Sequence, residues 1–136
     1  MFKCIALLKR KRELSREAFI EYYENNHAVL IHSLLPDILY YRRNFVDLNE
    51  AFVFPVAAPI DFDVITEIGF ADRAAYDRFI AMAAAPEIAR RIAEDEENLF
   101  DRTATRMLIV EERGDVSAIL EDGAPGQSRM IPNSSE

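Results

Sequence analysis

Two short runs of consecutive apolar residues, at 4–8 (Cys-Ile-Ala-Leu-Leu) and 107–110 (Met-Leu-Ile-Val), constrain the fold of this chain most strongly. A strand with one face in water alternates between apolar and polar residues, and neither run alternates. Both runs are also far too short to cross a membrane as helices. The pattern therefore predicts a strand near each end of the domain, and each of these strands should be covered on both faces.

The segments between these runs predict two strand-helix-strand units. The expected elements are a strand at 2–9, a helix from 15 to about 34, strands at 38–46 and 63–70, a helix that Asp72 caps and that carries Tyr76 to Met82, a helical segment at 86–99, and a strand at 105–111. The order βαββαβ is typical of an α+β, ferredoxin-like fold with a four-stranded antiparallel sheet. Helices cover only one face of such a sheet. We therefore expect a second copy to cover the other face, giving a homodimer in the form of a dimeric α+β barrel.

Two segments lie outside this pattern. Residues 47–62 contain Pro55 and Pro59 but are rich in Phe, Val and Ala, so we expect this loop to cover a pocket or to pack on a neighbouring subunit. Residues 113–136 carry glycines, prolines and few apolar side chains, which predicts a flexible or partner-draping tail. The chain is thus expected to hold one domain, at 1–112, followed by that tail.

Composition excludes several classes of protein. The 24 acidic residues outnumber the 16 basic ones, and the net charge of -8 argues against a nucleic-acid partner. Cys4 is the only cysteine, and a lone thiol in an apolar strand packs as a small hydrophobe. The sequence has no Cys-x-x-Cys motif, no His-x-x-x-His pair on a helix and no glycine-rich phosphate loop. We therefore expect no metal, no cofactor and no membrane contact, and a cytosolic location.

His27 is the strongest candidate for chemistry. At 100° per residue it falls within the apolar stripe of the first helix, four residues after Tyr23 and four before Ile31, whereas His32 falls on the polar side. Histidine titrates near neutral pH, so it can act as a general base and then as a general acid. The alternative is a structural histidine bonded to a backbone carbonyl.

Two carboxylates and a set of aromatic and amide groups complete the candidate site. Asp95 lies on the apolar side of its helix, and Glu67 lies in the middle of a strand, where Arg43, Arg106 or His27 could balance its charge. The alternative for Asp95 is a place at the flank of the helix where it reaches solvent, and the alternative for Glu67 is a structural ion pair. The expected substrate-binding residues, which could also be plain core, are Tyr22, Tyr23, Tyr41, Asn44, Phe62, Phe79, Met82 and Phe100.

Six stretches in order resemble the EthD family of dimeric α+β-barrel proteins over roughly residues 1–112. They are 3–10 (KCIALLKR), 14–19 (LSREAF), 22–28 (YYENNHA), 41–46 (YRRNFV), 67–70 (EIGF) and 95–101 (DEENLFD). The chain departs from the family pattern at Val29, where a proline often follows His-Ala, and in its longer tail. The resemblance implies a range of activities. Similar proteins include fungal polyketide dehydratases and decarboxylases and accessory proteins of ether degradation, and related barrels include cofactor-free monooxygenases, polyketide cyclases and a muconolactone isomerase.

Fold alone does not settle chemistry, so several functions stay open. We expect a cofactor-free acid/base enzyme, a lyase or isomerase, that dehydrates, decarboxylates or isomerises a small aromatic or polyketide-like carbonyl compound. His27 would move the proton, and Tyr22, Tyr41 or Asn44 would stabilise the developing oxygen charge. One alternative is an oxidoreductase, either a cofactor-free monooxygenase or a helper to one. The other is a non-catalytic module that binds a small hydrophobic ligand or serves a stress response.

Overall fold

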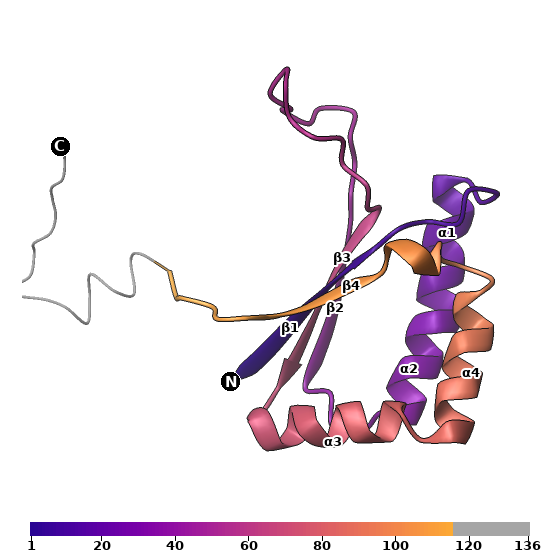
Figure 1. The fold of residues 1–136 in the computed structure, drawn as a ribbon, viewed down its shortest axis with the longest axis vertical. Helices are drawn as coiled ribbons and strands as arrows, with labels where there is room; N and C mark the ends of the chain where they lie inside the picture. Colours follow the sequence, from indigo (N-terminus) through magenta and orange to yellow (C-terminus); the bar gives the residue numbers. More distant parts are fainter. Residues whose placement is uncertain (116–136) are drawn as a thin grey trace, which may run out of the picture.

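A computed structural model describes residues 1–115 and has the predicted order of strands and helices (Figure 1). Its elements are β1 (Phe2–Leu8), α1 (Arg16–Tyr22), a π-helical turn (Tyr23–His27), α2 (Ala28–Leu34), β2 (Tyr40–Phe45), β3 (Val64–Phe70), α3 (Arg73–Ala83), α4 (Pro86–Glu96), a 3₁₀ turn (Arg102–Ala104) and β4 (Arg106–Val110). The strands form one antiparallel sheet in the order β2-β3-β1-β4. The α+β, ferredoxin-like fold class is confirmed. The tail predicted at 113–136 lies almost wholly outside the described residues.

Local sequence explains where the helices begin. The Ser15 side chain accepts a hydrogen bond from the Ala18 amide at 3.0 Å, and the Asp72 side chain caps α3 in the same way. Pro86 occupies the first turn of α4, where its missing N–H costs nothing. The first helical region is not uniform, however. It widens into a π-turn at Tyr23–His27, a feature that apolar periodicity does not predict.

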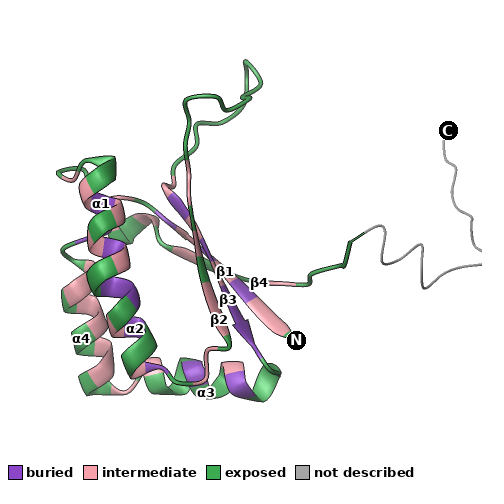
Figure 2. Cartoon of the chain, turned by 180° about the vertical axis from the view of Figure 1, so that it is seen from behind, coloured by how far each residue is buried: buried purple, intermediate pink, exposed green. Residues whose placement is uncertain are grey.

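The helices cover one face of the sheet, and the core lies between the two layers (Figure 2). The inward side chains of β1, which are Cys4, Ala6 and Leu8, are buried. The outward ones are only half-buried in the single chain, and Leu108 on β4 is exposed. The outer face of the sheet is therefore apolar at its centre, as the consecutive apolar runs predict.

The segment 47–62, which we call the arm, projects beyond the end of the sheet between β2 and β3 (Figure 1). Its tip is apolar and open to solvent: Phe52 and Val56 are each 87% exposed. The backbone of the tip is held by local turns, from the Ala51 amide to the Leu48 carbonyl and from the Ala57 amide to the Phe54 carbonyl. The expectation that this loop covers a pocket of its own chain therefore does not hold for the tip.

Candidate active site

His27 is buried inside the molecule, with only 3% of its surface exposed. It is the last residue of the π-turn, and it faces the sheet, whereas His32 one turn later is exposed. The imidazole ring meets the rings of Tyr23 and Phe100 edge to face, at centroid distances of 5.4 and 5.3 Å. Such contacts hold the ring in one orientation. A π-turn at this place is notable because π-bulges occur frequently at functional sites.

A chain of hydrogen bonds fixes the direction of the imidazole. The Asn98 amide donates to the Tyr22 hydroxyl at 3.2 Å, so the Tyr22 hydroxyl proton is free to point to Asp95 Oδ1, 2.5 Å away. The other oxygen of Asp95 lies 2.8 Å from His27 Nδ1. Because an ionised carboxylate only accepts, Nδ1 must carry a proton in this pair. In the neutral ring, Nε2 then carries the lone pair.

An apolar cavity of about 210 Å³ lies between the sheet and the helices, and His27 lines it whereas Asp95 does not. His27 and Glu96 both line this cavity, and Glu96 Oε2 lies 3.9 Å from His27 Nε2. Nε2 is therefore the ring nitrogen on the cavity side. The wall is otherwise mainly apolar and includes Leu8, Ile31, Leu35, Ile68, Phe79 and Met107.

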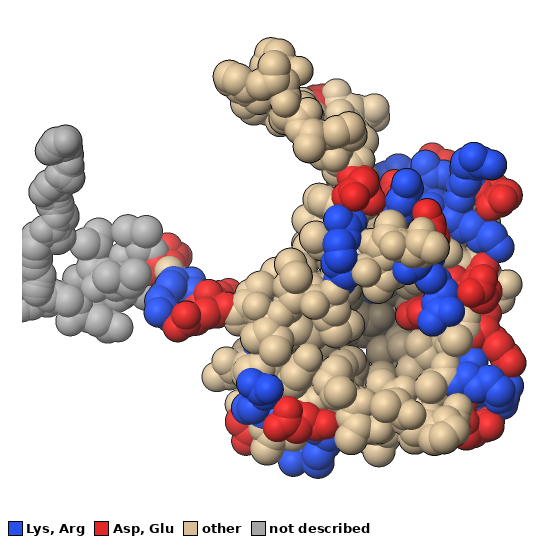
Figure 3. All heavy atoms as spheres, viewed as in Figure 1, with Lys and Arg blue, Asp and Glu red and all other residues tan. Residues whose placement is uncertain are grey.

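The cavity opens beside the edge strand β4. Met107 of β4 and Ile80 of α3 line it and are 45% and 42% exposed. In the space-filling view, a hollow is visible between the β4 edge of the sheet and the helices (Figure 3). The cavity that His27 lines is therefore open at this edge.

Three hydroxyl groups lie close together on the cavity wall. Tyr23 Oη lies 2.7 Å from Thr66 Oγ1 and 3.2 Å from Tyr41 Oη, and all three residues line the cavity. Burial raises the pKa of Tyr23 and raises that of Tyr41 well above its ordinary value. Both phenols therefore stay protonated at neutral pH. Three hydroxyl protons serve two mutual bonds, so one proton remains to bond another partner.

Several predicted site residues lie away from this cavity. Glu67 and Asn44 project from the outer face of the sheet, because their strand positions alternate with the buried Thr66 and with Tyr41. Lys3 approaches Glu67 at 2.8 Å, and Asn44 donates to it at 2.9 Å. The Lys3 hydrogen bond is the largest cause of the lowered pKa of Glu67.

The expectation that Arg43, Arg106 or His27 balances Glu67 is wrong. Arg43 points to the helix side and pairs with Glu24 at 2.7 Å. Arg106 shares the outer face with Glu67 but reaches Asp61 at 3.1 Å.

The remaining predicted site residues differ in whether they line the His27 cavity. Tyr22 acts on His27 only through Asp95, and Phe100 packs on the imidazole without lining the cavity. Phe79 lines the cavity. Met82 is exposed outside the lining, and Phe62 lines a different pocket at the base of the arm.

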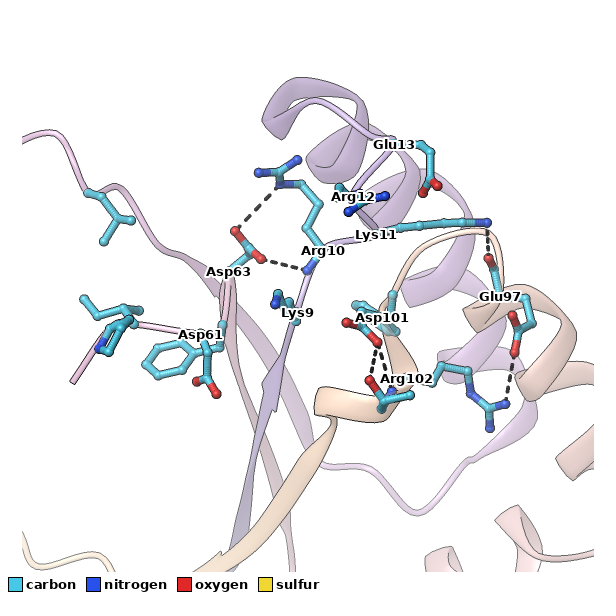
Figure 4. A pocket seen from close by; sticks show the side chains of 16 residues that line it. Lys9, Arg10, Lys11, Arg12, Glu13, Asp61, Asp63, Glu97, Asp101 and Arg102 are labelled. Carbon is cyan, nitrogen blue, oxygen red and sulfur yellow. Dashed lines mark hydrogen bonds and ion pairs between the residues drawn. The ribbon is translucent and has the colours of Figure 1, made fainter.

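That second pocket, of about 820 Å³, is bordered by the loop after β1, the base of the arm and the 3₁₀ turn (Figure 4). Some of its polar groups are engaged by the protein. The Arg10 amide donates to Asp63 at 2.7 Å, Lys11 donates to the Glu97 carbonyl at 2.8 Å, and the Asp101 side chain caps the 3₁₀ turn. Arg10 Nε lies 3.7 Å from Asp63 Oδ1 and has no hydrogen-bond partner among the described residues.

Sequence reasoning missed Glu96, Thr66 and Asn98. Asn98 follows Asp95 by three residues, a spacing that places two side chains on the same side of a helix. Thr66 alternates with the apolar Val64 and Ile68, so an inward hydroxyl could have been inferred from the strand. The local sequence around Glu96 does not indicate a role for it, because only the docking of α4 beside His27 brings Glu96 to the cavity.

Comparison with known proteins identifies the family to which this chain belongs. The family model described as "EthD domain" matches residues 11–103. HapK from Hahella chejuensis is similar in structure at a TM-score of 0.56, with 18% sequence identity over 85% of this chain and 95% of that one. A protein from Bacillus halodurans that is described as an EthD family protein has a TM-score of 0.53 and 19% identity over 83% of this chain and 100% of that one.

A third structure is a protein from Bacteroides fragilis described as dimeric, with a ferredoxin-like fold. Its TM-score is 0.50, with 11% identity over 82% of this chain and 95% of that one. At such identities these likenesses show the fold alone. Among functionally curated proteins, none matches the chain.

Within residues 1–115, no helix combines the length and the apolar character needed to cross a bilayer. Within the same residues, no three side chains of His, Cys, Asp or Glu gather as a metal site would require.

Proposed function

Since the chain belongs to the EthD family, whose fold it has, we propose that it is an acid/base enzyme acting on a small carbonyl compound with His27 as its proton carrier. One observation carries the proposal. Asp95 holds the proton of His27 on Nδ1 at 2.8 Å, so the basic Nε2 is left at the apolar cavity. A base that is oriented by a carboxylate and faces an apolar hollow has the arrangement that general-base catalysis needs.

The chemistry begins with removal of a proton from the carbon beside the substrate carbonyl. His27 Nε2 takes this proton, and the electron pair of the broken C–H bond moves to the carbonyl oxygen as an enolate. Asp95 stabilises the resulting imidazolium through the Nδ1 bond. The spare hydroxyl proton of the Tyr23–Tyr41–Thr66 group can donate to the enolate oxygen.

The fate of the enolate depends on the substrate. If His27 returns the proton to a different carbon, the result is an isomerisation; if it gives the proton to a leaving hydroxyl, the result is a dehydration. Decarboxylation of a β-keto acid is not part of this proposal, because the neutral ring that Asp95 orients carries no proton on Nε2 to replace the lost CO₂. The other two routes draw on side chains alone, so the proposed enzyme needs no cofactor.

The size of the cavity supports a substrate with one ring. A volume of about 210 Å³ exceeds the ~150 Å³ that accommodates benzene in an engineered protein cavity, but it lies below the range of about 300–1,000 Å³ for drug-sized ligands. A single aromatic or alicyclic ring with one carbonyl group fits these limits. A fused polyketide does not.

We propose further that the protein acts as a homodimer. The outer face of the sheet carries the apolar Ile5, Leu7 and Ile65, and the exposed Leu108 extends this patch to the edge. The dimeric state of the structurally similar Bacteroides fragilis protein supports the assignment. Sedimentation velocity should give a dimer for the wild type and a monomer for Leu108→Asp. Val29→Asp, an exposed change on α2, is the control and should remain dimeric.

Proton exchange tests the catalytic proposal without knowledge of the natural substrate. Acetophenone is incubated with the protein in D₂O, and loss of its methyl proton signal is followed by NMR. We expect exchange to be faster than in buffer, since a positioned general base typically contributes ~10²–10⁴-fold. His27→Ala should abolish the gain, while His32→Ala, the exposed histidine of the same helical region, should keep it.

Other outcomes would favour other functions. Equal exchange by the wild type and by a folded His27→Ala variant contradicts the proposal. Binding of acetophenone with no exchange would favour a non-catalytic binding module. A product that forms only in the presence of dissolved oxygen would favour the oxidoreductase alternative. The cytosolic location inferred from the sequence stays a prediction.

A further inference from the structure

Negative charge outweighs positive charge among the described side chains that line the His27 cavity. Glu96 is the only carboxylate among the residues that line the cavity, and no lysine or arginine of the described chain lines it. Its Oε2 lies 3.9 Å from His27 Nε2, at the place where a bound ligand must approach the base. On the other side of the imidazole, Asp95 adds a second carboxylate.

The nearby guanidinium does not balance these charges at the cavity. Arg102 Nε contacts the outer oxygen of Glu96 at 3.1 Å, and its Nη1 also reaches Glu97 Oε2 at 3.3 Å. The Arg102 side chain is 44% exposed and stands outside the lining. One guanidinium is thus shared between two carboxylates, while Asp95 is engaged with His27. A ligand that approaches His27 Nε2 therefore lies beside the negative charge of Glu96.

We propose that Glu96 makes this cavity reject anionic ligands, so that its substrate is an uncharged single-ring carbonyl compound. This inference rests on the proposed function in taking the His27 cavity as the substrate site. Glu96 acts as a specificity-determining residue and takes no proton in the reaction. Free carboxylic acids, which are anionic at neutral pH, are excluded, whereas ketones, amides, esters and lactones are accepted.

The geometry gives a scale for this discrimination. Two like unit charges about 5 Å apart, at an effective dielectric constant of about 20, change a binding constant by roughly two to three hundredfold. The ion pair with Arg102 offsets part of this repulsion. We therefore expect a preference of about tenfold or more for an uncharged ligand over an anionic one of the same shape.

Benzamide and benzoate form a suitable pair of probes, because they share one planar shape and differ in charge at neutral pH. Their binding constants are measured by NMR titration of the methyl groups around the cavity. The wild type should bind benzamide at least about tenfold more tightly than benzoate. In Glu96→Gln, the difference should shrink to about threefold or less.

Glu94→Gln is the matched control. Glu94 lies on the same helix but pairs with Arg90, is exposed and does not line the cavity, so this variant should keep the wild-type preference. Benzoate binding as tightly as benzamide in the wild type would overturn the inference. An unchanged preference in Glu96→Gln, or failure of both probes to bind, would also overturn it.

The binding measurement separates this inference from the proposed function. Ligand preference is recorded without turnover, whereas proton exchange reports only on His27 as a base. If the protein prefers benzamide but does not exchange acetophenone protons, charge selection by Glu96 is supported and the catalytic proposal is refuted. If the protein exchanges the protons but shows no preference between the two probes, His27 is supported as a base and the role of Glu96 is refuted.

Discussion

Replacing Asp95 by asparagine keeps the size of the side chain and removes its charge. The structure predicts how the new amide will turn. Asn98 already donates to the Tyr22 oxygen, so the Tyr22 hydroxyl must donate to position 95. The amide oxygen of the new residue will face Tyr22, and its NH₂ group will face His27. His27 Nδ1 must then accept, and the ring proton moves to Nε2 at the cavity.

The cost to stability follows from the two hydrogen bonds that Asp95 accepts. Hydrogen bonds to charged groups contribute about 1.5–3 kcal/mol and neutral ones about 0.5–1.5 kcal/mol. The side chain of Asp95 is only 16% exposed, so solvent screens these bonds weakly. Losing the charge from both bonds should therefore lower the free energy of unfolding by about 2 kcal/mol. For a domain of this size, that corresponds to a fall in Tm of roughly 5–10 °C.

Nitrogen-15 chemical shifts of the imidazole measure the predicted change directly, at a pH alkaline enough to keep histidine neutral. In the wild type, the His27 proton should lie on Nδ1, and in Asp95→Asn it should lie on Nε2. Proton exchange of acetophenone should fall at least about a hundredfold in the variant, since the base has lost its lone pair at the cavity.

Asp77→Asn provides the control. Asp77 forms an exposed ion pair with Arg73 on α3, and such pairs contribute about 0.2–1 kcal/mol at most. This variant should leave the His27 shifts and the exchange rate unchanged. The reasoning fails if the His27 proton occupies the same nitrogen in the wild type and in Asp95→Asn.

Two further predictions concern buried groups of the core. Burial raises the pKa values of Tyr23 and Tyr41, so the unfolded chain releases these phenolic protons near pH 10 while the folded protein retains them. Stability should be intact below pH 10 and fall above it by about 1.4 kcal/mol per pH unit for each tyrosine, and denaturant titrations of a Tyr23→Phe/Tyr41→Phe variant should show a shallower fall. Burial also raises the pKa of the Cys4 thiol to about 11. Ellman's reagent at pH 8 should therefore modify Cys4 only at the rate of unfolding, and rapid modification of the native protein would contradict its burial.

The order of the strands and helices could be predicted from the sequence because each is encoded locally. Short apolar runs mark the two end strands, a period near 3.6 marks the helices, and caps such as Ser15 and Asp72 mark where helices begin. The same periodicity placed His27 on the buried side of its helix and His32 on the exposed side. The sequence by itself thus determined the fold class and which histidine faces the sheet.

The composition of the site was decided by packing between distant segments. His27 and Asp95 are 68 residues apart in the chain, and the docking of α4 beside the π-turn brings Asp95 and Glu96 to the two nitrogens of one ring. The register of β2 on β3 turned Asn44 and Glu67 to the opposite face of the sheet. Periodicity along one segment says which side of it is buried, but only the tertiary contacts set which side chains of other segments it meets there.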